Sequence, residues 1–202
     1  MLIAIEGIDG SGKSTQASLL YDSLRKNNKV FLTKEPSKGL IGVSIRELLH
    51  RNDLSPMAMQ MLFAADREEH ISKTIVPKLD EGYHVITDRY NLSTLAYGMA
   101  SGIDRKRLEG ICYGIPEPTI TFVLDIGGDK AYNRLKALGK ELSVFEKQFC
   151  LPWTSSRYAS LALSRNSCFS NTESSFPRAL SLLYALSPPI SSTKVIVGSG
   201  MP

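Results

Sequence analysis

Residues 7–15, close to the start of the chain, restrict the possible folds more than any other segment. They read GIDGSGKST and fit the pattern G-x-x-x-x-G-K-[ST] of a phosphate-binding loop. An apolar run precedes them and a helical pattern follows, so the loop joins a buried strand to a helix. The glycines let the backbone curl until successive N–H groups face phosphate oxygens, and the positive end of the helix dipole adds to the attraction. The segment predicts a site for nucleotide phosphates.

The residue types in this loop have separate chemical reasons to be there. Lys13 can reach the β- and γ-phosphates as a point charge, and the hydroxyl of Ser14 can ligate Mg²⁺. A glycine-rich turn without a ligand would show the same glycines, but the strand–loop–helix context favours phosphate binding. The residues expected to bind the nucleotide are Gly7, Asp9, Gly10, Ser11, Gly12, Lys13, Ser14 and Thr15.

Strand-like and helix-like segments alternate along the first two thirds of the chain. Apolar runs predict strands over residues 2–6, 29–33, 83–87 and 119–124. Helical periodicity predicts helices over residues 13–26, 41–50, 55–80, 92–99, 104–112 and 129–138, with a bend at Pro77 in the third. This order is typical of an α/β protein, here a three-layer P-loop NTPase fold whose parallel β-sheet is flanked by helices. Ligand sites in such folds lie at the carboxyl ends of the strands.

Composition narrows the class of protein further. The hydrophobic fraction of 43% and the charged fraction of 22% are those of a globular domain, and a net charge of +4 fits a small anionic substrate without requiring nucleic acid. Cys112, Cys150 and Cys168 are scattered and predict neither a disulfide framework nor a zinc site. Glu6 interrupts the N-terminal apolar run, and no apolar run approaches 18 residues, so we expect no signal peptide, no membrane contact and a cytoplasmic location.

Residues 148–202 differ in composition from residues 1–147. Of the 24 basic and 20 acidic residues, only five lie in this C-terminal segment, which is rich in serine and proline. Its one strand-like run is residues 193–197. The segment is either a divergent extension or a stretch translated out of the ancestral frame. We favour the second, because a well-patterned first part and an unpatterned second part rarely belong to one consistent sequence.

Further motifs occur at fixed places after the loop. The chain reads EP at residues 35–36, LFAADR at residues 62–67 and DRYNLSTLAY at residues 88–97. Taken with residues 6–15, their order and spacing resemble the thymidylate kinase family of P-loop nucleoside monophosphate kinases. The resemblance covers residues 1 to about 147, with a weaker similarity at residues 157–162. It implies phosphorylation of dTMP to dTDP with ATP and Mg²⁺, and a homodimer formed through helices of the first half.

Several residues in these motifs have chemistry that suits a nucleotide site. Arg89 follows a strand beside the loop, where a guanidinium can grip a phosphate bidentately. Asp88 ends that strand and either holds Mg²⁺, directly or through water, or orients Arg89. Phe63 and Arg67 are four residues apart and share a helical face, so a ring can stack on a pyrimidine beside a guanidinium donor. The family resemblance implies that Phe63 stacks on thymine and that Arg67 donates to its O4.

The remaining acceptor-site residues are expected from the resemblance. A carboxylate within an anion-binding loop is repelled by phosphate, so Asp9 is expected to face a hydroxyl instead, and the family's matching acid accepts from the 3′-OH of dTMP. Tyr97 resembles the tyrosine that crowds the 2′ position of the sugar. Ser93 and Thr94 either line the base pocket or serve as ordinary polar residues at the start of a helix.

Phosphoryl transfer also needs a cation over the transferring group. Some family members place an arginine in the loop, where this chain has Gly10 and Ser11; others supply it from a lid, which corresponds here to residues 135–147. Arg134 leads into that segment, and its cations are Lys136, Lys140 and Lys147. The expected catalytic residues are Lys13, Arg89, Arg134 and Lys140.

Three further functions are consistent with parts of the sequence. Residues 125–128 match D-x-x-G, which a GTPase switch would require, but no N-K-x-D occurs to bind guanine. A nucleotide-binding homologue with impaired catalysis would carry the same loop, and so would a kinase for a different nucleoside monophosphate.

Overall fold

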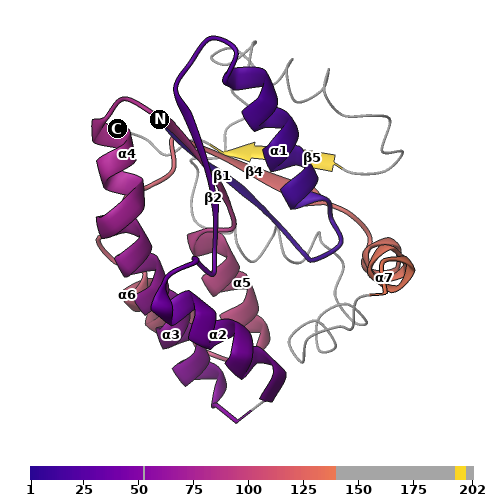
Figure 1. The fold of residues 1–202 in the computed structure, drawn as a ribbon. Helices are drawn as coiled ribbons and strands as arrows, with labels where there is room; N and C mark the ends of the chain where they lie inside the picture. Colours follow the sequence, from indigo (N-terminus) through magenta and orange to yellow (C-terminus); the bar gives the residue numbers. More distant parts are fainter. Residues whose placement is uncertain (52, 140–193, 199–202) are drawn as a thin grey trace.

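A computed structural model describes residues 1–51, 53–139 and 194–198 of the 202-residue chain (Figure 1). Within these ranges, strands and helices alternate as the sequence predicts. The strands are β1 (Leu2–Gly7), β2 (Val30–Lys34), β3 (His84–Asp88), β4 (Ile120–Asp125) and β5 (Lys194–Gly198). The helices are α1 (Lys13–Leu24), α2 (Leu40–Arg51), α3 (Pro56–His70), η1 (Ile71–Ile75), α4 (Val76–Asp80), α5 (Asn91–Ala100), α6 (Arg105–Ile111) and α7 (Gly128–Ala137).

The strands form one sheet in the order β2-β3-β1-β4-β5. The first four are parallel, with Ile5 opposite Asp88 and Gly7 opposite Leu124, which confirms the predicted α/β class with its parallel sheet. At one edge the structure adds β5, which runs antiparallel to β4. An apolar run predicts a buried strand but not whether that strand is parallel or antiparallel to its neighbour. Strand direction depends on the path of the chain rather than on the residues of the run.

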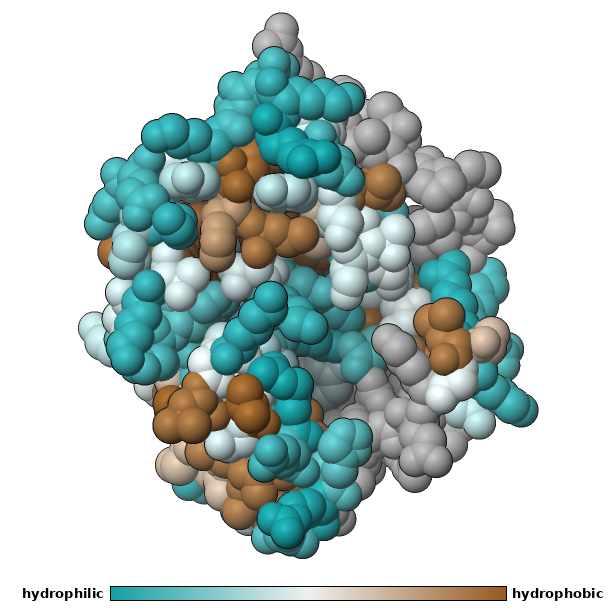
Figure 2. Space-filling model, in the orientation of Figure 1, coloured by the Kyte–Doolittle hydropathy of each residue, from teal (hydrophilic) through white to brown (hydrophobic). Residues whose placement is uncertain are grey.

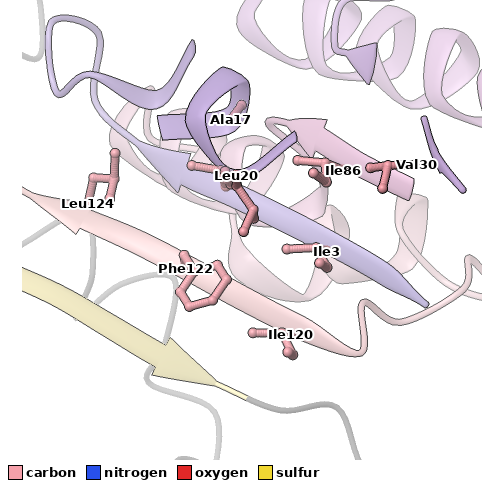
Figure 3. Packing of buried hydrophobic residues seen from close by; sticks show 9 residues of the cluster. Ile3, Ala17, Leu20, Val30, Ile86, Ile120, Phe122 and Leu124 are labelled. Carbon is pink, nitrogen blue, oxygen red and sulfur yellow. The ribbon is translucent and has the colours of Figure 1, made fainter. Parts of the chain in front are cut away.

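The core follows the two-residue period of the strands. On β1, Ile3 and Ile5 are buried on the face that α1 covers, where Ala17 and Leu20 pack against them. Figure 3 shows this layer, with Ile120 and Phe122 of β4 alongside. Burying such side chains contributes roughly 1.5–3 kcal/mol each.

The opposite face of the sheet carries the alternate residues of the same strands. Leu2 and Ala4 of β1 pack with Ile71 and Ile75, which lie on the π-helical segment η1. The single helix expected over residues 55–80 is therefore three segments: α3, η1 and α4. Pro77 lies in the first turn of α4, directly after the wider turns of η1.

Two layers of helices thus enclose the sheet and make the three-layer architecture visible in Figure 1. In the part of the chain described, no helix has both the length and the apolar character needed to cross a membrane.

Candidate active site

The loop between β1 and α1 is shaped by glycines in the left-handed region. Gly7, Gly10 and Gly12 have φ angles of 140°, 79° and 97°. Gly12 is also the N-cap of α1, and since glycine has no side chain, no capping side chain accepts hydrogen bonds from the N–H groups of the first turn. These groups and the helix dipole remain for an anion, which is the arrangement that the motif predicts.

Lys13 lies over this loop rather than in solvent. Its Nζ donates to the carbonyl oxygen of Ile8 at 2.9 Å and to Oδ1 of Asp9 at 3.1 Å. Burial and the positive charge of Arg89 lower the pKa of Lys13, while Asp9 opposes the shift. An anionic phosphate at the loop would stabilise the charged lysine in the same way as Asp9 does.

Arg89 occupies the centre of the site. It follows β3 with a φ of 76°, a strained backbone conformation for a non-glycine residue that costs about 1–3 kcal/mol. Its guanidinium pairs with Asp9 and donates to the carbonyl oxygen of Gly7 at 3.2 Å and to Oγ of Ser93 at 2.9 Å. It also lies over the ring of Tyr97, 5.2 Å from the ring centre. One side chain therefore connects the phosphate loop with helix α5.

Ser14 and Asp88 face one another beside the loop. The Ser14 hydroxyl donates to Oδ2 of Asp88 at 2.6 Å. The second oxygen, Oδ1, is buried and has no hydrogen-bond partner in the described structure. The Ser14 hydroxyl and the Asp88 carboxylate, one of whose oxygens is buried without a partner in the described structure, suit a hard divalent cation. Within residues 1–51, 53–139 and 194–198, no cluster of three or more acidic, histidine or cysteine side chains offers a cage of its own.

A cavity of about 140 Å³ opens next to Arg89. The structure gathers around it all seven residues that the sequence assigns to the substrate, although those residues come from the loop, from α3, from Arg89 just after β3 and from α5. The full lining is Asp9, Glu35, Pro36, Leu49, Gln60, Phe63, Arg67, Arg89, Ser93, Thr94 and Tyr97. Sequence reasoning misses Leu49 and Gln60 as lining residues, and it identifies residues 35–36 only as a motif. Gln60 could have been found, because it precedes Phe63 by three residues on the same helical face.

Arg67 is buried, with 3% of its surface exposed, and is held on three sides. Its Nε donates to Oε2 of Glu35 at 2.7 Å, Nη1 to Oγ1 of Thr94 at 2.9 Å and Nη2 to the carbonyl oxygen of Tyr90 at 3.0 Å. Burial, the largest single influence, lowers the pKa of Arg67, but the charge of Glu35, its hydrogen bond to Arg67 and the charges of Cys112 and Glu6 together raise the pKa above its ordinary value. The guanidinium is thus a fixed, permanently charged group at the end of the cavity.

A second buried carboxylate, Glu6 on β1, positions the start of α5. It accepts from the backbone N–H groups of Tyr90 and Ser93, at 2.9 and 3.1 Å, and from Oγ of Ser93 at 2.6 Å. Ser93 is therefore both a residue of the first helical turn and a part of the cavity wall, so the two interpretations of this residue are compatible. In the sequence, Glu6 stands out only as an interruption of an apolar strand.

Helix α7 approaches the loop from the side of β4. A Cβ added to Gly10 would lie 2.5 Å from the carbonyl oxygen of Ala131, so the loop has no room for a side chain at that position. Arg134 instead donates from Nη1 to the carbonyl oxygen of Gly10 at 3.4 Å. The structure therefore places Arg134 at the loop, together with Lys13 and Arg89. Lys140, like most of the lid at residues 135–147, lies outside the described residues.

The fold and this site define a class: a P-loop protein with a cavity beside its phosphate loop. Comparison with known proteins narrows the class. The family model for thymidylate kinase matches residues 5–180. The chain belongs to the thymidylate kinase family, which confirms the resemblance seen in the sequence.

Individual relatives agree with this assignment. A probable thymidylate kinase of Pyrobaculum aerophilum is 44% identical over 138 residues, which are 68% of this chain and 70% of the relative. A probable thymidylate kinase of Pyrococcus abyssi is 42% identical over 152 residues, covering 72% and 74%. The crystal structure of thymidylate kinase from Ehrlichia chaffeensis superposes with a TM-score of 0.58 at 38% identity, covering 68% of this chain and 77% of that one.

Proposed function

We propose that this chain transfers the γ-phosphoryl group of ATP to dTMP and produces dTDP and ADP. The observation that carries the proposal is the position of Arg89. Its guanidinium contacts the phosphate loop through Gly7 and Asp9 and also lines the cavity that holds Phe63 and Arg67. A donor on the loop and a nucleotide acceptor in the cavity would therefore meet at one arginine, which suits phosphoryl transfer between two anions.

On the donor side, the proposal assigns the ATP phosphates to the backbone of residues 7–15 and to Lys13. Mg²⁺ would be held by Ser14 and Asp88, whose buried Oδ1 has no other partner in the described residues. The metal supplies neutralisation of charge on the phosphate oxygens when it is bound. Neither role requires a general base, because the acceptor phosphate is already anionic.

On the acceptor side, Phe63 would stack on thymine and Arg67 would donate to its O4. A guanidinium has five N–H groups, and the bonds to Glu35, Thr94 and Tyr90 use three of them. Asp9 and Tyr97 would face the sugar, since both line the cavity on the side of Arg89. Ser93 and Thr94 complete the wall from α5.

The charge that develops in the transition state would be met by Lys13, Arg89 and Arg134. Arg134 already reaches the carbonyl oxygen of Gly10, so its guanidinium lies beside the loop that would hold the phosphates. Lys140 remains part of the proposal through the family resemblance alone.

An assay of ADP release tests the proposal against the competing activities. ATP is supplied with dTMP, dUMP, dCMP, AMP, GMP or water as the acceptor. We expect fast turnover with dTMP, slower turnover with dUMP and none with the purines or with water. Turnover with water alone would point to an ATPase-like activity, and ATP binding without turnover would identify an impaired homologue. Either result would contradict the proposal.

We further propose a cytoplasmic homodimer. Helices α2 and α3 expose Leu40, Val43 and Met61 at 84%, 43% and 51%, and the apolar surface over these helices in Figure 2 favours association. Leu40 and Val43 are three residues apart and share one face of α2. Light scattering on a sizing column measures the mass, and a Leu40→Glu, Met61→Glu variant should run as a monomer. A monomeric mass for the unaltered chain would contradict the dimer.

The division of the chain at residue 147 is a separate proposal. The family match runs past this boundary to residue 180, and β5 supplies the edge strand of the sheet. Only five side chains in residues 148–202 are charged. For this reason we propose that this segment is translated out of the ancestral frame. Resequencing of the coding DNA decides it, and an uninterrupted frame with a similar segment in a sister strain would refute it.

A further inference from the structure

Gln60 is a buried polar residue on the wall of the cavity. It lies on α3 with 1% of its surface exposed, and neither its amide nitrogen nor its amide oxygen has a hydrogen-bond partner in the described structure. Gln60, Phe63 and Arg67 are spaced by three and four residues, so they occupy one face of α3, and all three line the cavity. One helix thus presents an amide, an aromatic ring and a guanidinium in a row.

The other polar side chains of the cavity bond to one another. Arg67 bonds to Glu35 and Thr94, and Arg89 bonds to Asp9 and Ser93. Gln60 differs from all of these, because it pairs with none of the residues that the structure describes. The hydrogen bonds of Arg67 and Arg89 do not involve Gln60, so these contacts do not require an amide at this position.

A buried amide without partners is costly for the ligand-free protein. Most buried polar groups in folded proteins are hydrogen-bonded, and an exception needs a reason. Leu49, Pro36 and Phe63 make the same cavity partly apolar, so a leucine or methionine would suit residue 60 better if only stability mattered. A ligand that bonds to the amide supplies a reason.

We propose that Gln60 binds the polar edge of the acceptor base. Its Oε1 accepts from N3–H of thymine, and its Nε2 donates to the neighbouring ring carbonyl, which is the donor–acceptor pattern of an imide. Phe63 provides the stacking surface between Gln60 and Arg67. The inference deepens the proposed function and rests on it, because it takes the nucleobase of dTMP as the occupant of the cavity.

Substitution by apolar residues of similar shape separates a binding role from a structural one. In Gln60→Leu and Gln60→Met we expect the Kd for dTMP, measured by calorimetry, to rise roughly tenfold, as the loss of two neutral hydrogen bonds implies. The melting temperature of the ligand-free protein should rise at the same time, because an unpaired buried amide is removed. A structural residue would show the reverse: lower stability and an unchanged Kd.

Gln16 provides a matched control. It is a buried glutamine on α1 whose amide atoms also have no partner in the described residues, but it does not line the cavity. Gln16→Leu should therefore raise the melting temperature without changing the Kd for dTMP.

A methylated ligand tests the same bond in the unaltered protein. N3-methyl-dTMP cannot donate to Oε1, so the unaltered protein should bind it much more weakly than dTMP, and Gln60→Leu should discriminate far less. Equal binding of the two ligands by the unaltered protein, or an unchanged Kd for dTMP in both variants, overturns the inference while the proposed function stands. A failure of the unaltered protein to bind dTMP overturns both.

Discussion

Replacing Arg67 by methionine should destabilise the protein far more than replacing an exposed arginine. Arg67 and its partner Glu35 are both buried, at 3% and 6% exposure, and Nε and Oε2 are 2.7 Å apart. The variant leaves the Glu35 carboxylate in the protein interior without its cation. Breaking a buried pair in this way costs about 3–5 kcal/mol, which is a large part of the roughly 5–15 kcal/mol that stabilises a typical domain.

Urea denaturation of the ligand-free protein measures this cost as a loss in the free energy of unfolding. Arg25→Met is the matched control: Arg25 pairs with Asp22 at 2.9 Å, but both side chains are 58% exposed. The control should lose less than about 1 kcal/mol, as exposed pairs do. The double variant Glu35→Gln, Arg67→Met should be more stable than Arg67→Met, because it no longer buries an unpaired charge.

Two results would refute this reasoning. One is a loss in Arg67→Met no larger than in the control, which would mean that Glu35 does not depend on Arg67 for its charge. The other is a double variant that is less stable than the single one, which would mean that the carboxylate is stabilised chiefly by His70, whose Nδ1 lies 3.4 Å from Oε1 of Glu35.

The remaining predictions concern the loop and its surroundings. Gly10→Ala should lower the melting temperature more than Gly102→Ala. Both variants place alanine at a φ near 80°, which costs about 1–2 kcal/mol. Only at Gly10 would the new Cβ also clash with the backbone of α7, 2.5 Å from the carbonyl oxygen of Ala131. Equal losses would show that α7 does not rest on the loop. Asp88→Asn should raise the Mg²⁺ concentration needed for half-maximal turnover by about tenfold or more without changing the Kd for dTMP, and an unaltered Mg²⁺ titration would contradict the metal assignment. Arg134→Ala should lower kcat by roughly a hundredfold, whereas Lys130→Ala, which removes an exposed lysine of the same helix, should not. Equal effects would remove Arg134 from the mechanism.

The predictable parts of the site are those whose physical cause is local. Residues 7–15 specify their own conformation, because glycines at positive φ and a helix start are properties of a short segment. The pairing of Phe63 with Arg67 follows from helical geometry alone. The sequence predicts one helix over residues 55–80 because η1 keeps the apolar pattern of a helix while changing its hydrogen bonding.

Contacts between distant segments could not be predicted in this way. Glu35 reaches Arg67 across 32 residues, and Glu6 reaches Ser93 across 87. A single sequence does not show which donor binds to which buried carboxylate, because several arrangements of the strands would satisfy the same apolar pattern. Gln60 illustrates the limit: its place on the face of Phe63 follows from helical spacing, but its lack of partners depends on the packing of every neighbour.

By itself, the sequence determined the alternation of strands and helices and the phosphate loop, because each rests on residues close together in the chain. It also determined the family, because the order and spacing of the motifs can be read along the chain without knowing the fold. The tertiary structure alone decided that β5 runs antiparallel to β4. It also decided that Gly10 has no room for a side chain, because α7, which carries Arg134, packs against the loop. Finally, it decided that Gln60 lines the cavity with an amide that has no partner among the described residues. These features depend on how surfaces from separate segments meet, and close packing allows only one of the many ways in which they could do so.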